Sequence, residues 1–151
     1  MIIALTGHRS EDCVSEEHVR QQVRNVLQPI LDGPETPLII TGMANGFDLW
    51  GGTEALRLGC PVWAAKPWTT HGPRKSDIEL YAEIIENADQ VFNVTEADDY
   101  PGPWVYHKRN EFMVDHSDKV LAYWNGKQAG GTYACINYAN KVGKRVRNCH
   151  A

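Results

Sequence analysis

Short apolar runs alternate with longer amphipathic segments along the whole chain. Most of the apolar runs are only a few residues long and continuously hydrophobic, which is typical of strands that are covered on both faces of a sheet. This alternation predicts an α/β fold in which parallel strands are joined by helical crossovers. The expected strands are residues 2–6, 38–41, 62–65, 90–94, 119–124 and 145–147.

The segments between these strands have helical periodicity. Ser15 is a good cap for a first helix, whose apolar positions 19, 23, 26 and 27 fall on one face, and Pro29 is expected to kink or end it. The other expected helices span residues 47–58, a segment that begins near Pro73 or Ser76, and residues 104–116 and 131–142. The third should turn Ile78, Tyr81, Ala82, Ile85 and Ala88 inward, and the loop at 97–103 is expected over the site.

Composition and charge narrow the class of protein. A chain of 151 residues with 42% hydrophobic and 23% charged residues suits one globular domain. The N-terminus has neither the basic flank nor the apolar length of a signal peptide or membrane span, so we expect a cytoplasmic protein with no membrane partner. A net charge of −4 without a long basic run argues against duplex nucleic acid as a partner.

Cysteine and histidine spacing gives no sign of a metal site. Cys13, Cys60, Cys135 and Cys149 lie far apart and form no Cys-x-x-Cys pair, so we expect reduced thiols. The histidines are scattered as well. The sequence therefore predicts no metal and no cofactor.

Three loops after expected strands carry glycine beside polar residues. Because ligands collect beyond the carboxyl ends of parallel strands, these loops are candidate binding segments. A glycine pair and a threonine at a helix start can bind phosphate through backbone amides and a hydroxyl. The carboxylate at position 48 can accept a bond from a ribose hydroxyl or cap its own helix. The candidates are Gly7, His8 and Arg9, then Gly42, Met43, Gly46 and Asp48, and finally Gly130, Gly131 and Thr132.

The helix expected at 104–116 adds a cation to this set. Arg109 can fork onto a phosphate, and Asn110 follows it directly. The spacing of the glycines matches neither the dinucleotide fingerprint nor the Walker loop, so neither NAD binding nor ATP hydrolysis is indicated.

Taken in order, Thr6 to Arg9, Gly42 to Asp48, Arg109 to Asp115 and Gly130 to Thr132 resemble the SLOG superfamily, specifically its YpsA-like branch. The resemblance covers nearly the whole chain. It implies one Rossmann-like three-layer domain over residues 1–151, with a mainly parallel sheet of five to six strands. It also implies binding of a nucleotide or a nucleotide-derived signal, and some members act in bacterial and phage conflict.

A sister branch of that superfamily comprises phosphoribohydrolases, which split the N-glycosidic bond of nucleoside monophosphates. In the comparison, Arg109 matches that branch's arginine, and Asn110 replaces its lysine. Where the catalytic glutamate is expected, three residues after Thr132, this chain has Cys135. A thiol with an ordinary pKa is a poor substitute for a carboxylate at an oxocarbenium-like centre.

These observations favour a protein that binds a nucleotide or an ADP-ribose-like ligand without turnover, as a sensor or a sequestering protein. The alternative is an enzyme acting on an N-glycosidic bond, with Asp48, Glu111 or Asp115 supplying the carboxylate. An interaction module without a ligand ranks last. Oligomeric state is open, because the helix at 47–58 suits a dimer interface as well as a core.

Overall fold

Six parallel strands form the single sheet of the computed structural model, which describes residues 1–151. The strand order is β4-β3-β2-β1-β5-β6. The strands are β1 (Ile2–Gly7), β2 (Leu38–Thr41), β3 (Val62–Trp68), β4 (Gln90–Thr95), β5 (Lys119–Tyr123) and β6 (Arg145–Asn148). The predicted α/β class and the Rossmann-like architecture are confirmed.

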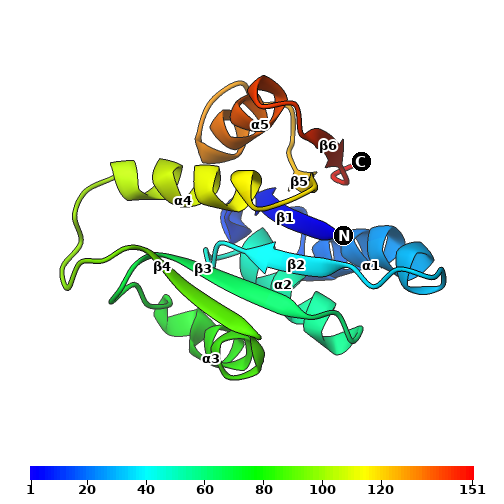
Figure 1. Cartoon of the computed structure of the whole chain (residues 1–151), viewed down its shortest axis with the longest axis horizontal. Helices are drawn as coiled ribbons and strands as arrows, with labels where there is room; N and C mark the ends of the chain where they lie inside the picture. Colours follow the sequence, from blue (N-terminus) through cyan, green and yellow to red (C-terminus); the bar gives the residue numbers. More distant parts are fainter.

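Five helices cover the sheet in two groups. They are α1 (Glu16–Leu31), α2 (Phe47–Arg57), α3 (Ile78–Asn87), α4 (Trp104–Asp115) and α5 (Gly131–Lys141), with short 3-10 turns at Ser10–Asp12 and Lys75–Asp77. Helices α1, α2 and α3 lie on one face of the sheet, and α4 and α5 lie on the other (Figure 1). Each pair of consecutive strands is therefore joined by one helix, and helices cover both faces of the sheet, as in a doubly wound sheet.

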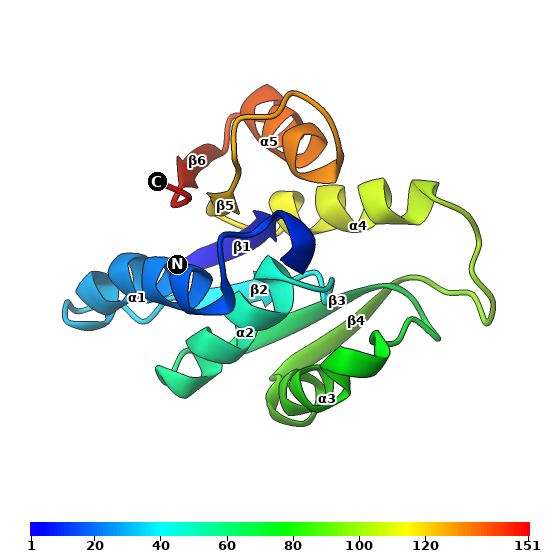
Figure 2. The ribbon, with the colours of Figure 1, turned by 180° about the vertical axis from the view of Figure 1, so that it is seen from behind.

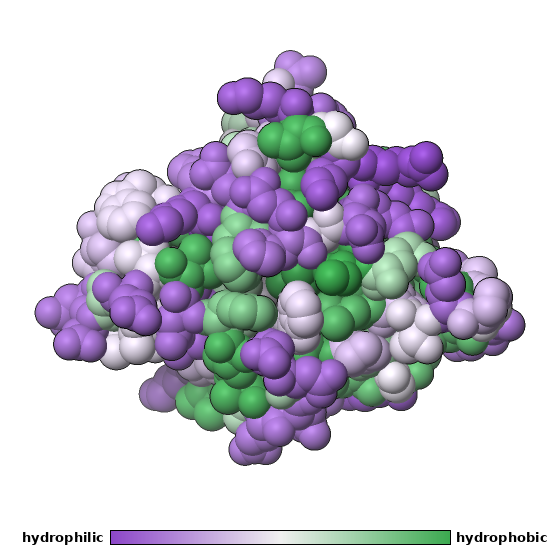
Figure 3. Space-filling model, viewed as in Figure 1, coloured by the Kyte–Doolittle hydropathy of each residue, from purple (hydrophilic) through white to green (hydrophobic).

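The two faces bury separate hydrophobic cores. The larger core, of 19 buried residues, lies under α1, α2 and α3 and contains the fully buried Phe47, Leu27 and Ile39. The smaller core, of 8, lies under α4 and α5. Because two helices cover the second face, several hydrophobic side chains there stay partly exposed, and Figure 3 shows them at the surface beside α4.

Helix α2 lies inside the protein. Eight of its eleven residues are buried, between α1 on one side and α3 on the other. Its apolar character is therefore explained by the core. None of the helices combines the length and the apolar character that crossing a bilayer requires.

Three local expectations are wrong. Of the two outcomes expected at Pro29, an end of α1 is wrong: the helix continues to Leu31, since a proline in the last turn removes only one backbone hydrogen bond. Ile78 is 56% exposed, because it begins α3 on the outer side of the helix, whereas Asp77 before it is buried. Strand β4 is not covered on both faces: it forms one edge of the sheet, and Val91 is 42% exposed.

Candidate functional site

A cavity of about 710 Å³ lies at the carboxyl ends of β1 and β5, on the side of the molecule where the β4–α4 loop runs (left in Figure 1). After β4, at one edge of the sheet, the chain crosses to the other side of β1 and forms β5 there. The connections that leave β1 and β5 therefore run in opposite directions, which leaves room between their loops. The volume is in the range of small-ligand sites, roughly 300–1,000 Å³.

Most of the predicted ligand contacts lie around this one cavity, although they come from segments up to about 120 positions apart. The predicted residues that line it are Gly7, His8, Arg9, Asp48, Arg109, Asn110, Gly130, Gly131 and Thr132. Arg109 and Gly131 therefore face the same space. Gly42, Met43 and Gly46 do not line it.

These three residues shape the β2–α2 loop instead. A Cβ atom on Gly46 would lie 2.5 Å from the His8 carbonyl oxygen, so a side chain there would push the first loop away. Met43 has a left-handed backbone (φ 66°), is 1% exposed and packs in the larger core. A Cβ atom on Gly42 would lie 2.8 Å from Asp48 Oδ2 and 3.0 Å from Arg109 Nε. The glycine thus leaves space for a carboxylate and a guanidinium.

Asn45 fastens three loops together at the edge of the site. Its side-chain oxygen accepts hydrogen bonds from the Ser10 amide (2.9 Å) and the Ser10 hydroxyl (2.8 Å), and its Nδ2 donates to Asp77 (2.9 Å). The loops after β1, β2 and β3 are held in one arrangement by this single side chain. Pre-formed walls reduce the ordering cost of binding a ligand.

Helix α5 begins at the cavity with no side-chain cap. Gly130, its N-cap residue, has φ 91°, a left-handed conformation that favours glycine. The amides of Gly131, Thr132 and Tyr133 donate to no group in the chain. A helix start of this kind presents free N–H groups and the positive end of the dipole to an anion.

Arg109 places a buried positive charge beside that helix start. Only 6% of the residue is exposed. Its Nη1 donates to the Gly42 carbonyl (2.9 Å) and its Nε to Asn110 (3.1 Å), while the Tyr106 ring lies 5.7 Å from the guanidinium carbon. Nη2 makes no hydrogen bond within the chain. The guanidinium is therefore held in place with donor capacity left over.

Asp48 is the buried carboxylate of the site, with 5% exposure. Its Oδ2 accepts one long hydrogen bond from the Ala44 amide (3.4 Å), and Oδ1 has no partner. Burial raises its pKa to about 6, although the Arg109 charge acts in the opposite direction. The two groups form no salt bridge within 4.0 Å, and desolvation also lowers the pKa of Arg109.

Further cations gather at the mouth of the cavity. Arg9 and Lys127 line it, and neither side chain forms a salt bridge or a hydrogen bond to the chain. The Arg9 charge is close enough to lower the pKa of Arg109. Two guanidinium groups that repel each other across one space are stabilised by an anion placed between them.

His8 has a structural task besides facing the cavity. Its Nε2 accepts a hydrogen bond from the Asn125 amide (2.9 Å), which ties the β5–α5 loop to the loop after β1. Desolvation lowers the pKa of His8, so the neutral ring needed for this bond is favoured.

Of the three candidate catalytic carboxylates, only Asp48 lines the cavity. Glu111 and Asp115 are exposed on α4, and Asp115 accepts a hydrogen bond from the Tyr138 hydroxyl (2.7 Å). Cys135 is 4% exposed, and burial raises its pKa to about 11. The thiol is therefore protonated at neutral pH and is a weak nucleophile. All four cysteines are free.

The sequence analysis missed several residues of the cavity wall, among them Asp12, Tyr106, His107, Asn125 and Lys127. One signal was available for Tyr106, which stands three positions before Arg109 and four before Asn110, and so shares their face of α4. Asn125 and Lys127, in the loop after β5, gave no such signal, because they reach the cavity only through the path of the backbone.

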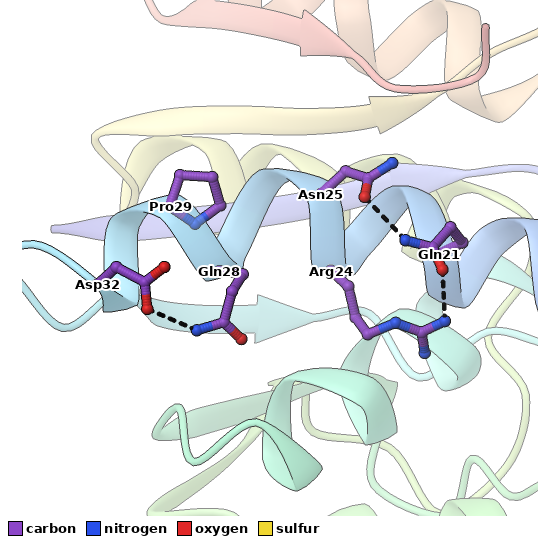
Figure 4. Close-up of a pocket in the computed structure, with 6 residues that line it drawn as sticks. All are labelled: Gln21, Arg24, Asn25, Gln28, Pro29 and Asp32. Atoms are coloured by element: carbon purple, nitrogen blue, oxygen red, sulfur yellow. Dashed lines mark hydrogen bonds between the residues drawn. The ribbon is translucent and has the colours of Figure 1, made fainter.

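A second hollow, of about 390 Å³, lies on the outer side of α1 (Figure 4). Its six lining residues come from that one helix and from Asp32, which directly follows it. None of them is hydrophobic, and side chains bond to one another, as in the Gln28–Asp32 pair (2.8 Å). A hollow between polar side chains along one helix, whose polar groups already bond to one another, offers no convergent donors. No group of three or more His, Cys, Asp or Glu residues is placed to hold a metal ion.

Comparison with known proteins supplies a family and a set of relatives. The model of the YspA SLOG family matches residues 3–148. The chain is 40% identical over 71 residues to the uncharacterized SPbeta prophage-derived protein YoqJ of Bacillus subtilis, covering 41% of each protein. It is 23% identical over 145 residues to a UPF0398 protein of Staphylococcus aureus strain JH9, covering 83% of this chain and 74% of that protein.

The fold is also similar to a solved structure of DNA processing protein A from Helicobacter pylori, described for its single-stranded DNA binding mode. The TM-score is 0.74 at 20% sequence identity, over 97% of this chain and 63% of that one. The chain thus spans less than two thirds of both YoqJ and DNA processing protein A.

The prediction of partners, which named a small ligand and excluded duplex nucleic acid, was wrong to leave single strands out of account. It is contradicted by the likeness of the fold to DNA processing protein A, a protein described for its single-stranded DNA binding mode. The physical reason is that net charge describes the whole surface, whereas binding depends on the local field, and Arg9, Arg109 and Lys127 surround one cavity.

Proposed function

Because the chain belongs to the YspA SLOG family, we propose that its cavity binds the phosphate group of a nucleotide unit, without turnover. The unit is either a free nucleotide or a nucleotide at the end of a single strand. The observation that carries this proposal is the presence, in one cavity, of the uncapped start of α5 and the buried guanidinium of Arg109.

Each part of the cavity has a role in this proposal. The amides of Gly131, Thr132 and Tyr133 donate to phosphate oxygens, and Arg109 Nη2 adds a charged donor. Arg9 and Lys127 supply long-range attraction at the mouth. Asp48 offers an unused acceptor in the wall, which suits the hydroxyl of a sugar.

The test measures thermal unfolding with AMP, with ribose 5-phosphate and with a 5′-phosphorylated tetrathymidylate. A ligand present at 100 times its dissociation constant stabilises the folded protein by about 2.7 kcal/mol, which corresponds to roughly 5–10 °C in Tm for a domain of this size. We expect such a rise with at least one of the three compounds.

Two variants separate binding from folding. Arg109→Met should abolish the rise, but the arginine is buried and its loss also removes the bond to Gly42. Gly131→Ala should fold normally, since a Cβ atom there meets nothing within 4 Å. Its methyl group points toward the helix start, over the free amides, and should weaken binding about tenfold or more. Ser76→Ala, on the exposed segment before α3, is the control.

Two results would contradict the proposal. One is the absence of any rise in Tm with all three compounds, and the other is an unchanged affinity in both variants. Chromatography of the incubated AMP checks turnover, and release of free adenine would show that the cavity hydrolyses the N-glycosidic bond.

A further inference from the structure

Three aromatic side chains meet at the edge of the cavity. Trp68 ends β3, Tyr100 lies in the β4–α4 loop, and Tyr106 lies in the first turn of α4. The Trp68 ring centroid is 5.1 Å from that of Tyr100 and 6.0 Å from that of Tyr106, and the two tyrosine rings are 6.2 Å apart. We call these three residues the aromatic rim.

The aromatic rim adjoins the proposed phosphate site. Tyr106 belongs to both, because it lines the cavity and its ring lies 5.7 Å from the Arg109 guanidinium carbon. The loops that carry the rim are tied together, since the Ala97 amide donates to the Thr69 hydroxyl (3.2 Å). Figure 2 shows these two loops side by side beyond the carboxyl ends of β3 and β4.

The rim is not part of either hydrophobic core. None of its three residues belongs to a core cluster, and Tyr100 is 53% exposed. The rings pack in edge-to-face and tilted arrangements, so the exposed Tyr100 ring keeps area free for another flat ring. An exposed aromatic ring beside a cationic cavity is the combination that proteins use to hold a base next to its phosphate.

We propose that the aromatic rim is a stacking site for a nucleobase. This inference rests on the proposed function, since the phosphate held by Arg109 and α5 brings the base to the rim. The base belongs either to the bound nucleotide itself or to the next unit of a single strand. Stacking on a π-face is tolerant of base identity, so the rim predicts weak selectivity among bases.

The experiment compares dissociation constants of ribose 5-phosphate, AMP and 5′-phosphorylated tetrathymidylate, by calorimetry, in the parent chain and in Tyr100→Ala and Tyr100→Phe. Tyr138→Ala is the matched control, since Tyr138 is also a partly exposed tyrosine but is bonded to Asp115, at the other end of α4. Ribose 5-phosphate has no base and reports on the phosphate site alone.

We expect one or both base-containing compounds to bind roughly tenfold more tightly than ribose 5-phosphate. Tyr100→Ala should remove that advantage and leave ribose 5-phosphate unaffected, while Tyr100→Phe and Tyr138→Ala should keep it. An advantage for AMP assigns the rim to the base of a free nucleotide, and an advantage for the tetranucleotide alone assigns it to a single strand.

The inference is overturned if Tyr100→Ala retains the full advantage, or if ribose 5-phosphate binds as tightly as both other compounds; the rim then only packs the β4–α4 loop onto β3. That outcome leaves the proposed function intact, because the phosphate site still binds. Failure of all three compounds to bind refutes the proposed function and, with it, the stacking site.

Discussion

Asp48 illustrates the cost of building this site at the scale of one residue. Its carboxylate is buried, has one long hydrogen bond and lies near Arg109 without forming a salt bridge. Burial raises its pKa to about 6, so at neutral pH the ionised form destabilises the fold relative to the unfolded chain. Functional sites commonly accept such a cost.

Asp48→Asn should therefore stabilise the protein at pH 7, by on the order of 1–3 kcal/mol. When the pKa of a carboxyl group is higher in the folded protein than in the unfolded chain, the folded protein becomes more stable as the pH falls from about 6 to about 4. The difference in unfolding free energy between Asp48→Asn and the parent chain should therefore shrink over the same interval. Urea unfolding at pH 7, 5 and 4 measures it, and an advantage that does not change with pH would refute the argument.

Single residues also show how far the site follows from the sequence. Arg109 and the pair Gly130-Gly131 were predicted because cations and glycine-rich helix starts have a recognisable chemistry that is independent of the rest of the fold. The roles of Gly42 and Gly46 were not predicted, because each makes room for residues that are distant in the sequence, such as Arg109 and His8. A glycine pattern alone does not reveal which atom it accommodates.

At the scale of elements, an ion pair that the sequence analysis did not predict joins α1 to α2. Arg20 Nη1 lies 3.2 Å from Glu54 Oε1, and both side chains are more than 90% buried. Arg24 reaches the other oxygen of Glu54 (3.1 Å), and Arg20 Nη2 is buried without a partner. Loss of Glu54 would leave a buried guanidinium with only Glu16 to balance its charge.

Glu54→Ala should cost about 3–5 kcal/mol of unfolding free energy, because it breaks a buried pair and strands a charge. Glu83→Ala is the control. Its carboxylate pairs with Arg57 (2.9 Å) between α2 and α3, but the Arg57 side chain is 50% exposed and that of Glu83 is 31% exposed, so we expect less than about 1 kcal/mol. Chemical denaturation of both variants tests this, and equal losses would mean that burial does not set the strength of these pairs.

Two helix starts were predicted well from local signals, whereas the proline signal at position 29 did not mark the end of α1. The Ser15 side chain accepts a hydrogen bond from the His18 amide (3.0 Å), as expected of an N-cap, and α2 begins after Gly46 as predicted. The exposure of β4 and of Ile78 was not predictable in this way. Hydrophobicity marks a strand or a helix face, whereas its exposure depends on whether another element happens to lie beside it.

For the whole molecule, the buried Asp48 and the partly buried His71 should have opposite effects on stability as the pH falls. Desolvation lowers the pKa of His71 to about 4, and its Nδ1 lies 3.0 Å from the Tyr81 hydroxyl. When the pKa of a histidine is depressed in the folded protein, the folded protein becomes less stable as the pH falls through the ordinary value of 6.5 toward 4. Protonation of Asp48 makes the folded protein more stable over nearly the same interval.

The parent chain should therefore change little in stability between pH 6.5 and pH 4 through these two groups. In His71→Gln only the Asp48 contribution remains, so we expect this variant to gain on the order of 2 kcal/mol relative to the parent over that interval. Urea unfolding across the pH series measures the difference. The double variant with Asp48→Asn should lose the gain, and a double variant that keeps it would show that other groups are responsible.

The sequence by itself determined the succession of strands and helices along the chain, the parallel crossovers and the chemistry of the phosphate-binding candidates. These features depend on periodicity and residue type among near neighbours. Only the tertiary structure decided that β5 lies beside β1, that Asp48 and Arg109 are buried across Gly42, and that Tyr106 links the cavity to Trp68 and Tyr100. Burial, desolvation and shared cavities arise between segments tens of residues apart, and no local pattern specifies how those segments meet.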